Sequence, residues 1–309
     1  MPSPRVVDLF AGTGAFSLAF EEAGATVVFA NDMVETSKKI YDSNFEHKLR
    51  LGDLNDIPVE EIPAHDILTG GFPCQPFSVA GRQEGFADPR SNVFWKILEI
   101  LDAHKPKAVV LENVKNLVTH DEGNTFKTIR TELEKRGYTV SWKVLDTAKI
   151  TGLPQHRERI YIVALREGHF EFDFKIVPKR PVTDFYEAEI PAKYYYGPTS
   201  GVWGLVDEHV KTPGVIYQYR RVYVRENKSG ECPTLTANMG GGGHNVPIIL
   251  DARGKRKLTP RECFNFQGFP QTYKLPALAD SHLYKLAGNA VSVPVVRLIA
   301  QRLVPRLSE

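Results

Sequence analysis

Short β-branched runs alternate with amphipathic helical patterns through the first 165 residues of this 309-residue chain. Strands are predicted over residues 6–10, 26–30, 66–69, 107–111, 140–145 and 159–165, and helices over 15–23, 34–41, 93–103 and 125–135. Strands that alternate with helices in this way form a mostly parallel sheet covered by helices on both faces. We therefore expect a doubly wound, Rossmann-like α/β fold.

The pattern changes near residue 179. From there to residue 252 the chain is rich in Gly, Pro and Tyr and lacks long helical periodicity, which favours a smaller β-rich domain. Helical patterns return over 260–266 and 293–303. We therefore expect a first domain over 1–178, a second over 179–252, and a segment over 253–309 that returns to the first.

The composition limits which classes of protein and which cellular compartments we expect. The net charge is +2, which is low for a nucleic-acid-binding protein, although the basic residues cluster late in the chain. Three cysteines, Cys74, Cys232 and Cys263, are too few for a disulfide framework and fit no zinc spacing, so we expect a reducing cytoplasm and no metal site. No apolar run approaches the roughly 18 residues of a membrane span, and no signal peptide is expected.

A glycine-containing turn follows the first predicted strand. Gly12 and Gly14 let the backbone turn tightly and approach a ligand at a helix N-terminus. Asp32 after the second strand can accept hydrogen bonds from ribose hydroxyls, and Asp53 can reach an adenine amino group. The simpler interpretation is a tight strand-to-helix connection. A third glycine of the dinucleotide pattern is missing, which favours an adenosine ligand other than NAD.

A cysteine between two prolines follows the third predicted strand. Gly70 and Gly71 permit a sharp turn, and Pro73 and Pro76 restrict the backbone on either side of Cys74. A free cysteine is usually a small buried hydrophobic residue. In a Gly/Pro loop at the carboxyl end of a strand, a nucleophile is the stronger interpretation.

Two further groups point to the same edge of the sheet. Glu112 ends the next strand, where it is either a surface charge or an acid whose pKa is raised by partial burial. Arg157 and Arg159 are two residues apart, which places them on one face of a strand. They predict either a solvated edge or a fork for a phosphate or a base carbonyl.

Taken in order, the motifs DLFAGTGAFS, GGFPCQPFSVAG, ENV, QHRERIYIVA and LAGNAVSVPV make the chain similar to the bacterial cytosine-5 DNA methyltransferases of restriction–modification systems. The resemblance covers residues 4–166 and 253–305. It departs from the family at Thr13, where Gly-Thr-Gly replaces the common Gly-Leu-Gly.

The resemblance implies a role for each matching residue. Cys74 would attack carbon 6 of a cytosine, Glu112 would hold or protonate ring nitrogen 3, and Arg157 and Arg159 would bracket the base and the thiolate. The residues implied to bind S-adenosylmethionine are Phe10, Gly12, Thr13, Gly14, Asp32, Asp53, Pro73 and Asn289.

Residues 179–252 match the family's target-recognition position. Thr234 belongs to the short Thr-Leu motif found there, and Gln75 and Ser78 near the nucleophile are implied to contact DNA. We expect Gln218 to enter the duplex where the base leaves, and Arg220 or Arg221 to contact guanine edges. Candidate phosphate contacts are Lys228, Lys255, Arg256 and Lys257. For each of these residues a solvated loop is the alternative.

The implied partner is double-stranded DNA, with a monomeric prokaryotic enzyme and a cognate restriction endonuclease as its genetic partner. Three alternatives stay open. A transfer-RNA cytosine methyltransferase shares this catalytic set. A catalytically silent DNA- or adenosine-binding protein would give the intact set no function, and a nicotinamide enzyme would give none to Cys74.

Overall fold

The computed structural model describes residues 2–72, 93–220, 222–241 and 245–308. The chain forms two compact units. Unit 1 comprises residues 1–145, 158–175 and 295–309, and unit 2 comprises residues 146–157 and 176–294. Each unit is therefore built from segments that are distant in the sequence.

Unit 1 is built on a sheet with seven strands among the described residues, in the order β3-β2-β1-β4-β5-β7-β6. The strands are β1 Arg5–Leu9, β2 Thr26–Asp32, β3 Arg50–Leu51, β4 Ile67–Gly70, β5 Ala108–Val114, β6 Thr139–Asp146 and β7 Glu158–Leu165. The pairs from β3 to β5 are parallel, whereas β7 runs antiparallel to β5. The predicted α/β class and mostly parallel sheet are confirmed.

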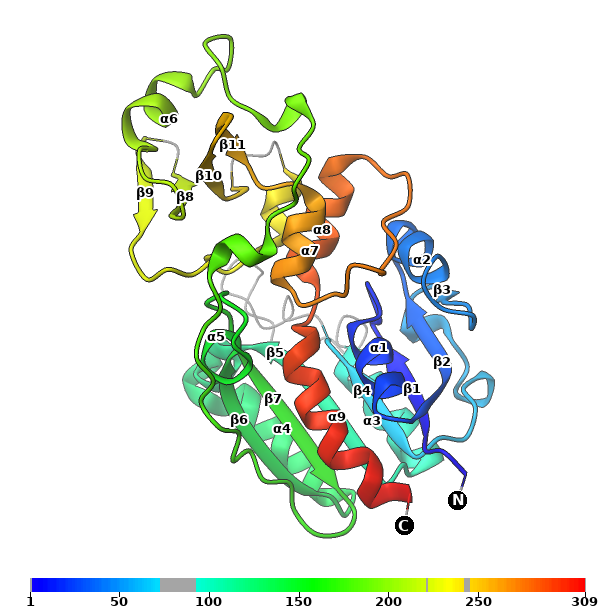
Figure 1. Ribbon diagram of the computed structural model, residues 1–309. Helices are drawn as coiled ribbons and strands as arrows, with labels where there is room; N and C mark the ends of the chain where they lie inside the picture. Colours follow the sequence, from blue (N-terminus) through cyan, green and yellow to red (C-terminus); the bar gives the residue numbers. More distant parts are fainter. Residues whose placement is uncertain (1, 73–92, 221, 242–244, 309) are drawn as a thin grey trace. The chain divides into compact units, whose positions relative to one another are not determined.

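Helices cover this sheet on both faces (Figure 1). They are α1 Ala15–Glu22, α2 Glu35–Asp42, α3 Val93–His104, α4 Asn124–Lys135 and α9 Val293–Ser308. Alternate strand residues such as Val109 and Leu111 pack with Phe94 of α3 and Ile129 of α4 in one buried cluster. Residues of opposite parity, such as Val110, point to the other face, because side chains alternate along a strand.

The antiparallel direction of β7 determines which polar residues lie close together at the edge of the sheet. The parallel strands β1, β2, β4 and β5 place their carboxyl ends at one edge of the sheet. Since β7 is antiparallel, its first residues reach that same edge, and Arg159 pairs in register with Val114. The start of β7 and the end of β5 are therefore neighbours.

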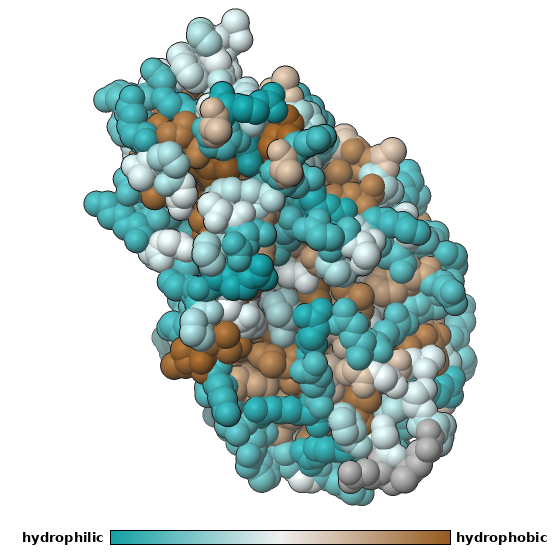
Figure 2. Space-filling model, in the orientation of Figure 1, coloured by the Kyte–Doolittle hydropathy of each residue, from teal (hydrophilic) through white to brown (hydrophobic). Residues whose placement is uncertain are grey.

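Unit 2 contains an antiparallel sheet in the order β11-β10-β8-β9. Its elements are α5 Thr147–Thr151, α6 Trp203–His209, β8 Ile216–Tyr219, β9 Val224–Asn227, β10 Ile248–Asp251, β11 Gly254–Lys257, α7 Pro260–Phe266 and α8 Asp280–Asn289. Val206 of α6, Tyr217 and Ile248 share one buried cluster. Figure 2 shows hydrophobic residues gathered between α6 and the β10–β11 hairpin, with hydrophilic residues around them. The predicted β-rich second part is confirmed.

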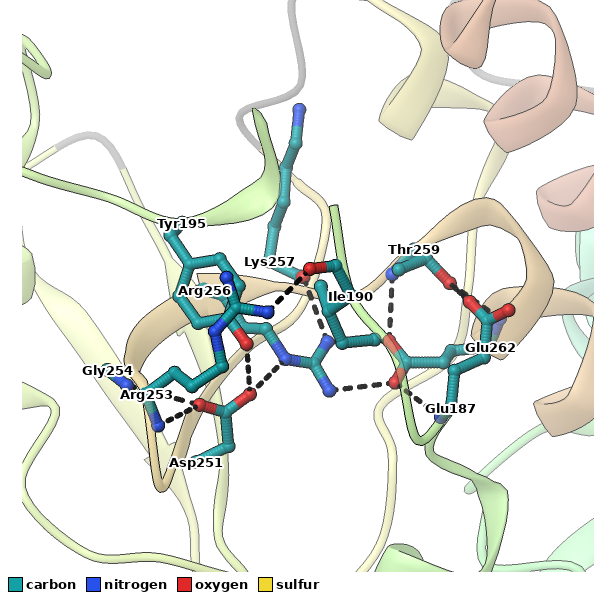
Figure 3. A network of polar contacts seen from close by, with 10 residues as sticks. All are labelled: Glu187, Ile190, Tyr195, Asp251, Arg253, Gly254, Arg256, Lys257, Thr259 and Glu262. Atoms are coloured by element: carbon teal, nitrogen blue, oxygen red, sulfur yellow. Dashed lines mark hydrogen bonds and ion pairs between the residues drawn. The ribbon is translucent and has the colours of Figure 1, made fainter. Parts of the chain in front are cut away.

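A buried ion-pair network joins β11 to the start of α7 (Figure 3). The Arg256 guanidinium lies 2.7 Å from the Glu262 carboxylate and 2.6 Å from that of Asp251. Glu262 also accepts the Thr259 backbone N–H, while Thr259 caps the helix through the Glu262 N–H. The side chain of Arg256 is 1% exposed. The prediction that Arg256 contacts a phosphate is therefore wrong, because two carboxylates already neutralise a cation that solvent cannot reach.

In the described part of the chain, no single helix is long and apolar enough to cross a membrane, although α8 and α9 taken together as a bent pair satisfy the length and composition criteria.

Candidate functional site

The turn between β1 and α1 has an unusual backbone. Phe10, Gly12 and Gly14 all have positive φ, at 54°, 54° and 73°. A non-glycine residue seldom adopts this conformation, and such strain persists where surrounding contacts impose it, commonly at functional sites. A side chain is also excluded at Gly14, because a β-carbon there would lie 2.3 Å from the Phe45 ring. The sequence pattern Gly-Thr-Gly is therefore a geometric requirement at this position.

Asp32 holds this turn from the end of β2. Its carboxylate accepts the backbone N–H of Gly12 at 2.9 Å and that of Val34 at 2.8 Å. The residue is 9% exposed, and burial raises the pKa of its carboxyl group despite these hydrogen bonds. A carboxylate at this place is the type of acceptor that ribose hydroxyls bind.

Asp53 lies beyond β3 in a separate local structure. Its side chain accepts the Asn55 backbone N–H at 2.9 Å and so caps a short 3₁₀ helix, Leu54–Asp56. Asn31 fixes the preceding loop by donating to the carbonyls of Arg50 and Gly52, both at 2.9 Å. Asp53 is thus held at the edge of the sheet that carries the glycine turn.

A buried carboxyl group beneath the turn was missed by sequence reasoning. Asp8 accepts hydrogen bonds from the Ser17 hydroxyl at 2.7 Å and from the Thr69 hydroxyl at 2.9 Å. Burial raises the pKa of Asp8 to about 6, although these donors oppose the shift. Alternation along β1 placed Asp8 on an inward face, which was the available signal. Asp8 joins β1, α1 and β4 below the ligand-facing turn.

Glu112 and Arg159 form an ion pair in unit 1, with 3.2 Å between the Glu112 carboxylate and Nε of Arg159. Their side chains are 10% and 15% exposed. The register of β5 and β7 explains this pair. Glu112 lies opposite Tyr161, and Arg159 lies opposite Val114. Glu112 and Arg159 are therefore diagonal neighbours on one face of the sheet. A carboxyl group and a guanidinium are therefore held together at the carboxyl end of β5.

Arg157 makes different contacts from Arg159. It precedes β7, belongs to unit 2 and is 2% exposed. Its guanidinium donates to the backbone carbonyls of Leu235 at 2.9 Å, Ala290 at 2.8 Å and Gly288 at 3.3 Å. Because Arg157 is outside the strand, the expected sharing of one strand face with Arg159 does not apply.

Contacts around Arg157 bring together three distant segments of unit 2. Gln155 accepts the Leu235 backbone N–H at 3.3 Å and donates to the side chain of Gln267 at 3.2 Å. A β-carbon at Gly288 would lie 2.1 Å from the Thr236 carbonyl carbon, so α8 touches the Thr-Leu segment backbone to backbone. Asn289 is the last residue of α8. Neither Gln155 nor Gln267 was singled out from the sequence.

The predicted DNA contacts of unit 2 lie around a polar cavity of about 590 Å³. Gln218, Arg220 and Thr234 line it. The Arg220 guanidinium donates to the Gln218 side-chain oxygen at 3.0 Å, and the Thr234 hydroxyl donates to the His156 carbonyl at 2.6 Å. Five predicted site residues lie outside the described residues: Pro73, Cys74, Gln75, Ser78 and Arg221. The predicted phosphate contacts Lys228, Lys255 and Lys257 do not line the cavity, and Lys255 is paired with Asp207.

The other two cysteines have the properties of structural residues. Cys232 and Cys263 are both fully buried, and burial raises the pKa of each thiol well above its ordinary value. A neutral buried thiol is a poor nucleophile. Neither Cys232 nor Cys263 therefore has the properties of a nucleophilic cysteine.

Comparison with known proteins gives the family. Residues 4–305 match the model of the C-5 cytosine-specific DNA methylases. The chain is 46% identical to the Type II methyltransferase M.Bsp6I of Bacillus sp. (strain RFL6), covering 97% of this chain and 98% of the relative. It is 42% identical to the Type II methyltransferase M.HaeII of Haemophilus aegyptius, covering 100% and 95%.

Solved structures share the fold. The S. pombe Dnmt2 methyltransferase superposes with a TM-score of 0.79 at 22% identity, covering 98% of this chain and 99% of that one. The Entamoeba histolytica methyltransferase EhMeth also gives 0.79, at 20% identity with full coverage of both chains.

The sheet with its reversed strand is the fold of the methyltransferases on which the structure superposes. The chain belongs to the C-5 cytosine-specific DNA methylase family. It is therefore an enzyme that methylates cytosine in DNA with S-adenosylmethionine as the methyl donor. The Asp32 carboxylate at the glycine turn fits that donor, since carboxylate oxygens accept hydrogen bonds from ribose hydroxyls.

Proposed function

We propose that this enzyme methylates carbon 5 of a cytosine that has left the helix stack, within a short specific duplex site, through a covalent adduct with Cys74. The observation that carries the proposal is the Glu112–Arg159 pair at the sheet edge where β4 ends at Gly70, four residues before Cys74. Neither face of a stacked base is accessible, so the base must leave the duplex first.

The residues have distinct roles in this mechanism. The Cys74 thiolate adds to carbon 6 of the ring, and Glu112 supports the resulting charge by a hydrogen bond or proton at nitrogen 3. Carbon 5 thereby becomes nucleophilic. S-adenosylmethionine, when bound, supplies the methyl group. Loss of the carbon 5 proton to a base and elimination of the thiolate then restore the aromatic ring and free Cys74.

Arg159 holds the Glu112 carboxyl group in place and would bind the same base. Arg157 would bracket the base and the thiolate, as the family motifs indicate, and its hydrogen bonds add a positioning role within unit 2. Its two terminal NH₂ groups donate to three backbone carbonyls, two of them at the C-terminus of α8, where a cation is favourable. Arg157 thus fixes the Thr-Leu segment to α8.

The cofactor residues remain those that the family motifs indicate. The turn formed by Phe10, Gly12, Thr13 and Gly14 would bind the amino-acid end of S-adenosylmethionine, and Asp32 and Asp53 would bind its ribose and adenine. The support is the strained turn and its Asp32 anchor. Pro73 and Asn289 would complete the pocket.

DNA would be bound by the domain over residues 179–252, with Gln218, Arg220, Arg221 and Thr234 nearest the bases and Gln75 and Ser78 behind the extruded cytosine. The catalytic domain would span 1–178, and the segment 253–309 would return to it. We further propose a monomeric enzyme in the prokaryotic cytoplasm that protects DNA from a cognate restriction endonuclease. The Type II names of the relatives support this assignment.

Bisulfite sequencing of DNA from bacteria that express the protein tests the proposal, with Cys74→Ser as the matched control. Methylcytosine confined to one short motif, absent with Cys74→Ser, is expected. A stable adduct with 5-fluorocytosine DNA should likewise need Cys74. Methylation by Cys74→Ser at the wild-type rate would contradict the covalent mechanism, and methylation of transfer RNA alone would contradict DNA as the substrate.

A further inference from the structure

The two strands β8 and β9 present one apolar and one polar face. Tyr217 and Val224 belong to the buried cluster with Val206 of α6. Gln218 and Arg225 are direct cross-strand partners in the register and point to the opposite face. That face forms a wall of the polar cavity of about 590 Å³. The β8–β9 ribbon is therefore anchored on one side and open on the other.

The side chains around this cavity are of the types that contact base edges. Besides Gln218 and Arg220 they are mostly amides, hydroxyls and one further arginine: Arg225, Asn227, Ser229, Thr234, Thr236, Asn238 and Asn245. Arg pairs with guanine, and Asn or Gln with adenine, when a two-stranded ribbon enters the major groove. The carboxylate of the cavity, Glu231, is neutralised by Lys179 at 2.7 Å. The cavity is thus cationic and suited to DNA.

The two described arginines of the cavity differ in what they already bind. Arg220 donates to the Gln218 side chain at 3.0 Å, so part of its hydrogen-bonding capacity orients that amide. Arg225 is exposed, and within residues 2–72, 93–220, 222–241 and 245–308 no hydrogen bond or ion pair of its guanidinium is found. The Arg225 guanidinium is therefore available to an acceptor that takes two parallel hydrogen bonds.

We infer that Arg225 is a specificity-determining residue that binds a guanine of the recognition sequence through its O6 and N7 atoms, beside Gln218, while Arg220 orients Gln218. The inference rests on the proposed duplex-DNA function and adds a residue that the family motifs did not indicate. A cross-strand neighbour has its Cβ about 5 Å away, so Arg225 and Gln218 would act on adjacent parts of one site.

The test compares wild type, Arg225→Ala, Arg225→Lys, Arg220→Ala and Lys228→Ala on a library of duplexes with randomised sequence. Methylated products are sequenced, and binding is measured at several salt concentrations. Lys228 is the matched control, because it follows β9, is exposed and carries the same charge, but does not line the cavity. Because Arg225 is exposed on the strand surface, its loss should leave the melting temperature near that of wild type.

With Arg225→Ala, the preference for guanine at one position of the site should fall roughly 5- to 150-fold. Arg225→Lys should restore only part of it, since an ammonium lacks the fork. Lys228→Ala should weaken binding equally for all sequences and make the salt dependence shallower.

Three results would overturn the inference. Arg225→Ala could keep the wild-type site profile, it could behave as Lys228→Ala does, or Arg220→Ala alone could relax the guanine position. In each case wild type still methylates a defined motif, so the proposed function would stand. Wild-type protein that methylates no duplex in the library would overturn both together.

Discussion

The polar residues at the sheet edge of unit 1 and those around the cavity of unit 2 are held in opposite ways. Glu112, Arg159 and Asp32 are largely buried and paired with other groups. Gln218 and Arg225, by contrast, lie on a strand face that opens to a cavity. Bond-making chemistry requires groups fixed before the substrate arrives, whereas base recognition requires donors that are still available. The two regions thus show which part of the enzyme is preorganised.

The largest effect is expected at Glu112. Glu112→Gln keeps the shape but cannot supply a proton or a full charge at nitrogen 3, so single-turnover methylation should slow on the order of 10²- to 10⁴-fold. Binding to duplex DNA should stay within a few-fold of wild type. An equal loss of binding and rate would show that Glu112 acts in recognition and would remove the contrast between the two regions.

The second largest effect is expected at Arg256, the buried arginine of β11. Arg256→Met leaves Glu262, which is 0% exposed, without its cation, and should destabilise unit 2 by about 3–5 kcal/mol in urea unfolding. The double variant Arg256→Met/Glu262→Leu should recover much of that loss, because it removes the unpaired charge. Failure of the double variant to recover would mean that the ion pair contributes net stability.

A smaller effect should follow the titration of Asp8. Its folded-state pKa of about 6 lies above the unfolded value, so the neutral form stabilises the fold at low pH, and this contribution is lost as the pH rises from about 4 through 6. The difference amounts to roughly 3 kcal/mol.

Asp8→Asn should therefore flatten the decline in unfolding free energy between pH 4 and 7, measured by urea denaturation at several pH values. Asp102→Asn, at an exposed residue of α3, serves as the control. Parallel pH profiles for wild type and Asp8→Asn would show that Asp8 is not the titrating group.

The smallest effect is expected at Thr234, whose hydroxyl donates to the His156 carbonyl from an exposed position. Thr234→Ala should cost unit 2 about 1 kcal/mol, and Thr234→Ser should restore it. A loss several times larger, measured by the same unfolding experiment, would show that the cavity wall is as rigid as the sheet edge.

Periodicity predicted most of the helices and strands of unit 1. Alternating strands and helices indicated the sheet, and the strand-end rule placed Asp32 and Glu112 at one edge. The reversed direction of β7 was not visible in the sequence, and it is what brings Arg159 to Glu112. A spacing of two residues suggested that Arg157 and Arg159 act together, but strand alternation applies only within a strand, and β7 begins at Glu158.

Unit 2 was harder to predict, because its contacts join short segments that are far apart in sequence. A basic run suggested that Arg256 was a surface residue, whereas its carboxylate partner Glu262 comes from the next helix. Arg225 is one residue among several in a basic and aromatic run, and only the pairing of β8 with β9 separates it from the others. Local sequence carries no signal for either arrangement.

The hydrogen bonds from Arg157 to the backbone carbonyls of Leu235, Gly288 and Ala290 have a consequence for how the sequences of these enzymes can diverge. The three acceptors are main-chain oxygens, so mutation at Leu235 or Ala290 can change the side chain without removing the bond. Gly288 is the exception, because any β-carbon there collides with Thr236. The residues that we propose to face DNA can therefore change, and give a new target sequence, while this backbone support is kept.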